Sequence, residues 1–324
     1  MTLQCTKVDI SGVVPPARTN HASAFWDGKL FVHGGNGDSK YDNCLSDFWT
    51  LDTSAMTWSQ PTTSGEEPGP RCHHTMDVVE GKLWVFGGWT GKRRCNFLHC
   101  LNLATWQWRD CTATMSAVDP HSSHASAVLD DHTILIVGRG ETGTHAKYGC
   151  NIDYLDTRTL KWSTFPGSTI SRAGHTVTFA PSICTRYAFV YGGRQRHETE
   201  HIVCKVKHPL PALFSSGFPE AMLKNGRRVE PPPGRSYHSA VDVNGVIVIY
   251  GGFIQGKSVR GLLDGVNELY LHNGQNQAWL VPQLKGEWPK RAGQIAARIG
   301  EASILLFGGE HAGRQFNDVH VITW

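Results

Sequence analysis

The sequence lacks the features that mark exported, membrane-spanning or disulfide-bonded proteins. Its 324 residues contain no Asn-x-Ser/Thr site, no apolar run long enough to cross a membrane, and no basic segment followed by a long apolar stretch at residues 1–10. The nine cysteines are an odd number without a paired rhythm, which is typical of reduced thiols. We therefore expect a soluble cytoplasmic or nuclear protein that does not bind membranes and has no disulfides.

Charge of one sign is also scarce. The formal net charge is only +3, whereas a nucleic-acid-binding domain is expected to be strongly basic with its charge clustered. The sequence thus predicts no nucleic-acid partner.

What the chain does have is an internal repeat. Six apolar runs each end in a glycine pair or a near copy of one, at 30–35, 83–88, 134–139, 187–193, 246–252 and 304–309. The first glycines of the six are 53, 51, 54, 59 and 57 residues apart. A period of this length is typical of architectures built from four-stranded units, so we expect one closed body rather than two domains.

Each repeat has the pattern of antiparallel strands. It opens with Arg-x-x-His or a variant, continues through a tight turn and the apolar run, and reaches the glycines. The turns Asp27-Gly28, Glu80-Gly81, Asn244-Gly245 and Gly300-Glu301 are expected to be two-residue hairpins. A tryptophan follows at the outer strand of four repeats, where a large ring can fill the space between splayed sheets, at Trp58, Trp108, Trp162 and Trp279.

Together, the Arg-x-x-His motif, the glycine pair and the spaced Trp resemble the kelch repeat over essentially the whole chain. The resemblance implies an all-β, six-bladed kelch β-propeller spanning residues 1–324. The expected blades are 18–62, 71–113, 121–166, 172–206 with an insertion at 207–233, 235–283, and 291–324 together with 2–10. The N-terminal strand would complete the last blade and close the ring, which removes open sheet edges.

In such a propeller the Arg-x-x-His turns and the loops that follow the glycines lie on one face. These loops hold 11 basic and 7 acidic residues, so the face is expected to be modestly basic and to prefer a carboxylate. Arg139, Arg194 and Arg196 are candidate partner-binding residues there. The arginines and histidines of the repeat motif itself are expected to brace the turns by hydrogen bonding.

Within the family, Arg194, Ser236 and Tyr237 resemble the pocket of kelch receptors that capture the C-terminal carboxylate of degradation targets. The resemblance implies that these three residues contact such a carboxylate. The second pocket arginine is absent, because Thr199 stands at its position, and no ligase-docking tail follows the last repeat.

Two enzyme motifs are present but fall in the repeat register. Residues 138–143 match G-x-G-x-x-G, yet a strand rather than a helix is expected next, which argues against a dinucleotide site. Residues 197–201 match H-E-x-x-H, which holds zinc only on a helix, and none is expected here. We therefore predict no catalytic residues, no metal and no cofactor.

The favoured function is a non-enzymatic, monomeric interaction module that binds a protein or peptide, acidic or with a free C-terminus, as scaffold or adaptor. One alternative is a ubiquitin-ligase substrate receptor that reads a C-terminal carboxylate. Another is a propeller enzyme with an undetected site, since propeller faces can host catalysis.

Overall fold

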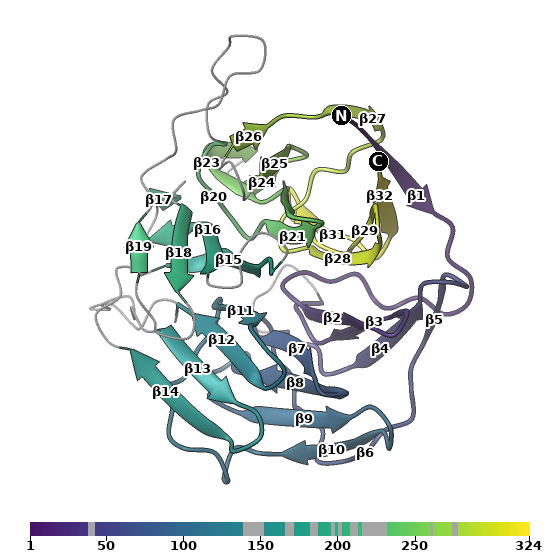
Figure 1. The fold of residues 1–324 in the computed structure, drawn as a ribbon. Helices are drawn as coiled ribbons and strands as arrows, with labels where there is room; N and C mark the ends of the chain where they lie inside the picture. Colours follow the sequence, from purple (N-terminus) through teal and green to yellow (C-terminus); the bar gives the residue numbers. More distant parts are fainter. Residues whose placement is uncertain are drawn as a thin grey trace.

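The computed structural model describes residues 1–37, 43–138, 152–165, 172–181, 187–195, 198–199, 203–207, 213–215, 232–259, 262–273 and 278–324. Over these ranges the chain forms short, mostly antiparallel sheets arranged as a propeller around a central axis, and no α-helix occurs among them (Figure 1). The predicted all-β propeller is confirmed. In the same ranges no helix is long and apolar enough to cross a membrane.

The first three repeats each supply one sheet. The first contains β2 (Ala22–Trp26), β3 (Lys29–His33), β4 (Phe48–Asp52) and β5 (Thr57–Ser59). The second contains β7 (Thr75–Val79), β8 (Lys82–Phe86), β9 (Leu98–Asn102), β10 (Gln107–Asp110) and the short β6 (Ser64–Gly65). The third contains β11 (Ala125–Val128), β12 (Thr133–Val137), β13 (Ile152–Asp156) and β14 (Lys161–Phe165).

The last three repeats follow the same order. The fourth contains β15 (Ala173–Phe179), β16 (Tyr187–Gln195), β18 (Val203–Lys207) and β19 (Leu213–Ser215), with β17 (Glu198–Thr199) paired to β16. The fifth contains β21 (Ser239–Val243), β22 (Val246–Tyr250), β25 (Leu269–Asn273) and β26 (Ala278–Leu280). The sixth contains β28 (Ile295–Gly300), β29 (Ser303–Phe307), β32 (Val319–Thr323), β1 (Thr2–Val8) and β27 (Gln283–Gly286). Smaller sheets join β20 (Arg235–Ser236), β23 (Phe253–Val259) and β24 (Leu262–Gly265), and β30 (Glu310–His311) and β31 (Arg314–Gln315).

The two ends of the chain meet in one sheet. Strand β1 pairs antiparallel with β32, from Gln4 opposite Thr323 to Val8 opposite Val319. The labelled termini lie close together beside these strands (Figure 1).

The repeat motif also builds a ring of backbone hydrogen bonds around the axis. Its third residue donates its N–H to the carbonyl of the third residue of the preceding repeat, over 2.7–2.9 Å each time. In donor order the ring runs Tyr237, Gly174, Ser123, His73, Asn20, Gly293 and back to Tyr237. All six residues have a positive φ, between 52° and 67°, which turns their N–H groups toward the neighbouring repeat.

The glycine pairs are needed because the backbone of the next repeat approaches them. A Cβ on Gly34 would lie 2.4 Å from the carbonyl oxygen of Arg71, and a Cβ on Gly35 would lie 2.7 Å from Cβ of His21. Both glycines also have a positive φ, +62° and +99°. The pair thus sits between the histidine of its own motif and the motif of the next repeat.

The motif arginines brace these glycines. Nη1 of each donates to the carbonyl of the first glycine of its own repeat, over 2.8–3.3 Å, in Arg18, Arg71, Arg172, Arg235 and Arg291. Three of them also form ion pairs, Arg18 with Asp47, Arg235 with Glu268 and Arg291 with Asp318. In the third repeat His121 replaces the arginine and pairs with the buried carboxylate of Asp153 at 3.0 Å. The structural role expected for the arginines is confirmed.

The outer tryptophans fill the space between sheets, as predicted. Trp58 packs on Phe307 with ring centroids 4.8 Å apart, and Trp162 packs on Phe86 at 4.6 Å. Trp108 lies against Phe48 and Trp279 against Tyr191 in the same way. Each ring therefore joins its own sheet to that of the preceding repeat.

Two local expectations were wrong. Strand β19 lies inside 207–233, which we expected to be an insertion, so part of that segment supplies an outer strand of the fourth sheet. The Gly300-Glu301 turn also differs, because Gly300 still belongs to β28 and pairs with Ser303. The other three hairpins have the expected two positive φ values.

Candidate functional site

The motif turns and the residues that follow the glycine pairs lie side by side at one end of the propeller. The second motif residue pairs with the residue directly after the glycines in each of five repeats, as Thr19 with Asn36, Cys72 with Trp89, Ala173 with Arg194, Ser236 with Phe253, and Ala292 with Glu310. This pairing supports the expectation that the loops after the glycines and the motif turns share one face.

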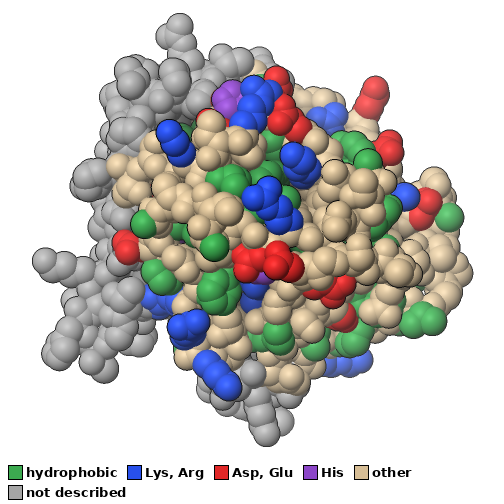
Figure 2. All heavy atoms as spheres, turned by 90° about the horizontal axis from the view of Figure 1, so that it is seen from below, with side chains coloured by type: hydrophobic (Ala, Val, Ile, Leu, Met, Phe, Trp, Pro, Cys, Tyr) green, Lys and Arg blue, Asp and Glu red, His purple; other side chains and the backbone are tan. Residues whose placement is uncertain are grey.

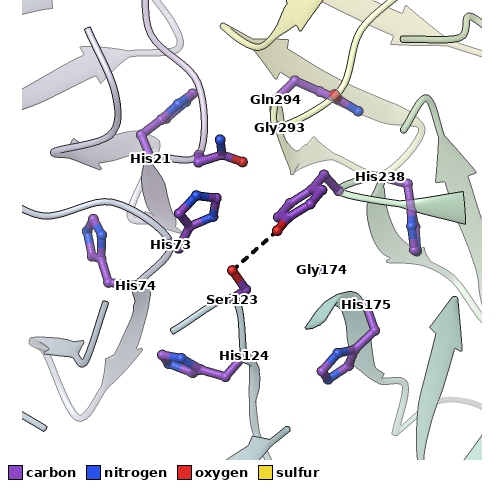
Figure 3. A pocket seen from close by; sticks show the side chains of 12 residues that line it. His21, His73, His74, Ser123, His124, Gly174, His175, His238, Gly293 and Gln294 are labelled. Carbon is purple, nitrogen blue, oxygen red and sulfur yellow. Dashed lines mark hydrogen bonds between the residues drawn. The ribbon is translucent and has the colours of Figure 1, made fainter. Parts of the chain in front are cut away.

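A central cavity of about 160 Å³ opens between the motif turns. It is lined by the third and fourth motif residues of all six repeats, namely Asn20 and His21, His73 and His74, Ser123 and His124, Gly174 and His175, Tyr237 and His238, and Gly293 and Gln294. Figure 3 shows these side chains around the axis. The repeat therefore delivers one pair of cavity residues from every sheet.

Tyr237 reaches across this cavity. Its hydroxyl lies 3.4 Å from Oγ of Ser123, the labelled residue at one end of the dashed hydrogen bond in Figure 3, and its ring centroid lies 5.5 Å from that of His73. Tyr237 therefore contacts the second and third repeats from the fifth. The ring also lies over Gly174, where an added Cβ would be 3.1 Å from three ring carbons. Glycine at the third motif position of the fourth repeat thus leaves the space that Tyr237 occupies.

Arg194 supplies a cation beside this ring. Its guanidinium carbon lies 5.2 Å from the Tyr237 ring centroid, and Nη2 donates to the Tyr237 hydroxyl over 3.2 Å. Phe253, directly after the glycines of the fifth repeat, lies 6.2 Å from the Tyr237 ring. We call His73, Arg194, Tyr237 and Phe253 the mouth cluster.

The fourth motif residues form a buried ring that is electrically neutral. Burial, the largest effect, and nearby arginine or histidine charges lower the pKa of all five motif histidines, that of His175 to about 3. The Nε2 atom of His175 lies 3.0 Å from the Val137 carbonyl, which can only accept, so this nitrogen carries the proton. Gln294 donates in the same way to the Tyr250 carbonyl.

These hydrogen bonds join neighbouring repeats. Nε2 of His124 lies 3.0 Å from the Thr75 hydroxyl, and Nε2 of His238 lies 2.9 Å from the Thr176 hydroxyl. His74 similarly contacts Nδ1 of His33 at 3.1 Å, whereas neither nitrogen of His21 has a partner among the described residues. The expected bracing role is therefore confirmed for four of the five histidines.

The structure describes three of the five predicted partner-binding residues. It brings Arg194 and Tyr237 together, and it buries Ser236 next to them, with 3 % of its surface exposed. Arg139 and Arg196 lie outside the described residues.

Sequence reasoning missed His73 and Phe253. The signal for both was their repeat position, since the third motif residue lines the cavity in all six repeats and the residue after the glycines pairs with the second motif residue in five of them.

His73 offers a direct check of this geometry. Burial, and secondarily the charge of Arg194, lowers the pKa of His73 to about 4. We expect Arg194→Ala to raise that pKa while leaving it below the ordinary value of about 6.5, because burial persists. Titration of the His73 ring by NMR in both proteins measures the change, and an unchanged pKa would show that Arg194 does not sit beside His73.

The histidines that line the cavity are not arranged as a metal site. Within the described ranges no three His, Cys, Asp or Glu side chains are arranged to hold a metal ion. In the H-E-x-x-H segment, Glu198 and Thr199 form strand β17 and not a helix, as expected. The G-x-G-x-x-G segment after Gly138 lies outside the described residues.

Charges of both signs are mixed on the face of the molecule drawn in Figure 2. Figure 2 shows the edge of the molecule at the bottom of Figure 1, where Lys and Arg side chains are interspersed with Asp and Glu among the described residues. That edge therefore presents no field of one sign to a partner.

Comparison with known proteins identifies relatives of similar architecture. Residues 1–193 match the family model described as the KLHDC2/KLHL20/DRC7 Kelch-repeats domain. The chain is 25% identical over 354 residues to the Rho GTPase-activating protein gacHH of Dictyostelium discoideum, covering 95% of this chain and 22% of that protein. It is 24% identical over 332 residues to kelch domain-containing protein 3 of Bos taurus, covering 96% of this chain and 69% of that protein.

The fold is also found in a solved structure. The structure of YjhT superimposes with a TM-score of 0.72 at 18% sequence identity, covering 94% of this chain and 95% of that one. The family model extends over more than half of the 324 residues. The chain therefore belongs to the kelch-repeat β-propeller family, whose members generally mediate protein–protein interaction.

Proposed function

We propose that this protein is a non-enzymatic interaction module that binds a protein or peptide partner at the mouth cluster. The observation that carries the proposal is the pairing of Arg194 with Tyr237 over the central cavity, at 3.2 Å from Nη2 to the hydroxyl. Arginine and aromatic side chains are the residue types that most often dominate binding at interfaces. Here Tyr237 belongs to the ring of motif hydrogen bonds and Arg194 lies near the end of β16, where it pairs with Ala173, so neither is carried by a long loop.

The chemistry of the cluster favours an acidic group on the partner. Arg194 provides a planar guanidinium with several donors, and the neighbouring His73 is neutral because its pKa is lowered to about 4. A carboxylate could replace or share the hydrogen bond that Arg194 now makes to Tyr237. The partner would be an acidic segment or a chain with a free C-terminus, and the protein would act as scaffold or adaptor.

A second candidate is a substrate receptor for a ubiquitin ligase that reads a C-terminal carboxylate. The nearness of Arg194 to Tyr237 favours it, as the resemblance to such receptors implied. Ser236, the third residue of that resemblance, is largely buried and would contribute only where the partner reaches into the turn.

Arg194→Ala is expected to remove partners from the set of proteins that co-purify with the wild type. Combining it with Arg196→Ala is expected to remove at least the same partners. The matched control is Arg158→Ala, since Arg158 is an exposed arginine paired with Glu80 away from the cluster. Affinity purification with mass spectrometry compares the sets, and an identical set in wild type and Arg194→Ala contradicts the proposal.

A peptide experiment separates the two candidates. Two peptides are used, one with acidic residues at its C-terminal end and one with acidic residues in its interior. Each is offered once with a free C-terminal carboxylate and once with a C-terminal amide. Capture of the peptides with a free C-terminal carboxylate but not of those with an amide supports the receptor. Equal capture of the free carboxylate and the amide forms supports the adaptor, which binds internal acidic segments.

We also propose that residues 1–324 form six blades, closed by the N-terminal strand, in a monomeric cytoplasmic or nuclear protein. The pairing of β1 with β32 and the ring of motif hydrogen bonds support the blade number and the closure. The third repeat, with Gly138-Arg139-Gly140 in place of a glycine pair, additionally resembles kelch domain-containing protein 9, and this finer resemblance stays a prediction.

A further inference from the structure

Two cysteines from neighbouring repeats are in contact at the loop face. Cys44 belongs to the loop after the first glycine pair, and Cys72 is the second motif residue of the second repeat. Their Sγ atoms are 3.4 Å apart, and neither cysteine is in a disulfide. Cys44 is half-buried, whereas Cys72 is fully buried.

The contact lies at a place where the fold joins adjacent repeats. Cys44 pairs with Asn36, and Cys72 pairs with Trp89, each through an isolated β-bridge. At the next junction the equivalent positions are Arg94, which pairs with Trp89, and Ser122, the second motif residue of the third repeat. There Nε of Arg94 donates to Oγ of Ser122 over 2.9 Å. Between the first and second repeats, the two cysteines thus stand where the next junction has a hydrogen bond between side chains.

We propose that Cys44 and Cys72 are a reversible disulfide-forming site whose oxidant is a small disulfide such as oxidised glutathione. The Cys44 thiol loses its proton to solvent, and its thiolate attacks one sulfur of the oxidant, releasing one glutathione thiolate. The sulfur of Cys72 then attacks Sγ of Cys44 and releases the second glutathione, whose departing sulfur takes the proton of Cys72. Two thiols are oxidised to one disulfide, and one glutathione disulfide is reduced to two thiols.

The order of the two steps follows from exposure. Cys44 is the thiol that solvent reaches, and it can therefore meet the oxidant first. Cys72 is shielded from any second molecule, but it already touches the sulfur that it must attack. This arrangement favours closure of the internal bond over accumulation of the mixed disulfide.

The bond would tie the first repeat to the second beside the cavity. Cys72 directly precedes His73, whose ring lies 5.5 Å from that of Tyr237. Oxidation would therefore exchange a non-covalent contact for a covalent one next to the mouth cluster. This inference depends only on the two thiols and holds whether or not a partner binds there.

The test uses the wild-type chain, because trypsin cleaves between Cys44 and Cys72 and leaves them in different peptides. The protein is incubated with oxidised glutathione, remaining thiols are alkylated under denaturing conditions, and the tryptic peptides are analysed without reduction. Residues 41–71 and 72–82 each contain one cysteine. We expect these two peptides to appear joined, with the mass of both less two hydrogens, and to separate after addition of dithiothreitol.

Cys100→Ser is the matched control, since Cys100 belongs to a second close thiol pair, with Sγ of Cys111 at 3.9 Å. The joined peptide should persist in Cys100→Ser and disappear in Cys44→Ser. If, in the wild type, 41–71 and 72–82 are recovered only as alkylated peptides or separate glutathione adducts, the proposal is wrong. Linkage of Cys72 to any cysteine other than Cys44 would overturn it equally.

Discussion

Acidification from pH 7 to pH 5 is expected to unfold this protein cooperatively. The five motif histidines are buried around the axis, with a pKa that burial lowers in each. In the unfolded chain the same residues titrate near 6.5. Below that pH the unfolded state binds more protons than the folded state, so acid favours unfolding.

The expected loss of stability is large because five repeats each contribute a buried histidine. Each such histidine removes about 1.4 kcal/mol of stability per pH unit below 6.5, until the pH reaches its folded pKa. Between pH 6.5 and pH 5 the losses from the five histidines add, so that together they remove a large part of the stability of a typical domain. Asp77 opposes them slightly, because burial raises its pKa to about 6.

Tryptophan fluorescence and far-ultraviolet circular dichroism measured from pH 8 to pH 4 follow the transition. His238→Gln provides the internal comparison, since Gln294 already occupies the same repeat position and hydrogen-bonds the Ser239 hydroxyl, as His238 hydrogen-bonds the Thr176 hydroxyl. This variant should lose about 1.4 kcal/mol less per pH unit than the wild type between pH 6.5 and pH 5. Equal stability of the wild type at pH 7 and pH 5 would show that the motif histidines are not buried in neutral form.

Gly34→Ala is expected to cost more than about 3 kcal/mol of stability, if the variant folds at all. The new methyl carbon would lie 2.4 Å from the Arg71 carbonyl oxygen and 3.1 Å from both Cε1 of His74 and the Leu45 carbonyl oxygen. Two of these three contacts are backbone atoms, so no side chain can move aside to relieve them. The junction between the first and second repeats would have to open.

Gly28→Ala in the same repeat separates crowding from backbone strain. Gly28 has a φ of +71°, close to the +62° of Gly34, but a Cβ there meets no atom within 4 Å. Its substitution should cost only about 1 kcal/mol, the strain of a left-handed alanine. Urea unfolding of both variants measures the free energies, and similar losses for Gly28→Ala and Gly34→Ala would refute the crowding argument.

The repeat was readable from the sequence because every copy solves the same physical problem. Gly34, Gly87 and Gly251 recur since the next repeat's backbone approaches each of them too closely for a side chain. The motif arginines recur since each binds a glycine carbonyl of its own repeat. A constraint that acts on neighbouring residues, and acts six times, leaves a pattern that one sequence can reveal.

Only part of the candidate site could be predicted from the sequence. Arg194 and Tyr237 stood out by resemblance, and the structure brings them together. The repeat position places His73 at the cavity, but its contact with Tyr237 spans 164 positions and depends on how three sheets converge on the axis. Strand β19 was missed for a related reason, since its outer position depends on pairing with β18 and not on a strong pattern of its own.

By itself the sequence determined the all-β repeat, the glycine junctions, the bracing arginines and the tryptophans that fill the space between sheets. These features depend on steric and hydrogen-bonding requirements that are met within a repeat or between adjacent repeats. Only the tertiary structure decided which side chains meet across the cavity, that Tyr237 reaches Ser123 and His73, and that Cys44 touches Cys72. Such contacts join distant positions, and they come from the way the ring curves, which no local pattern encodes.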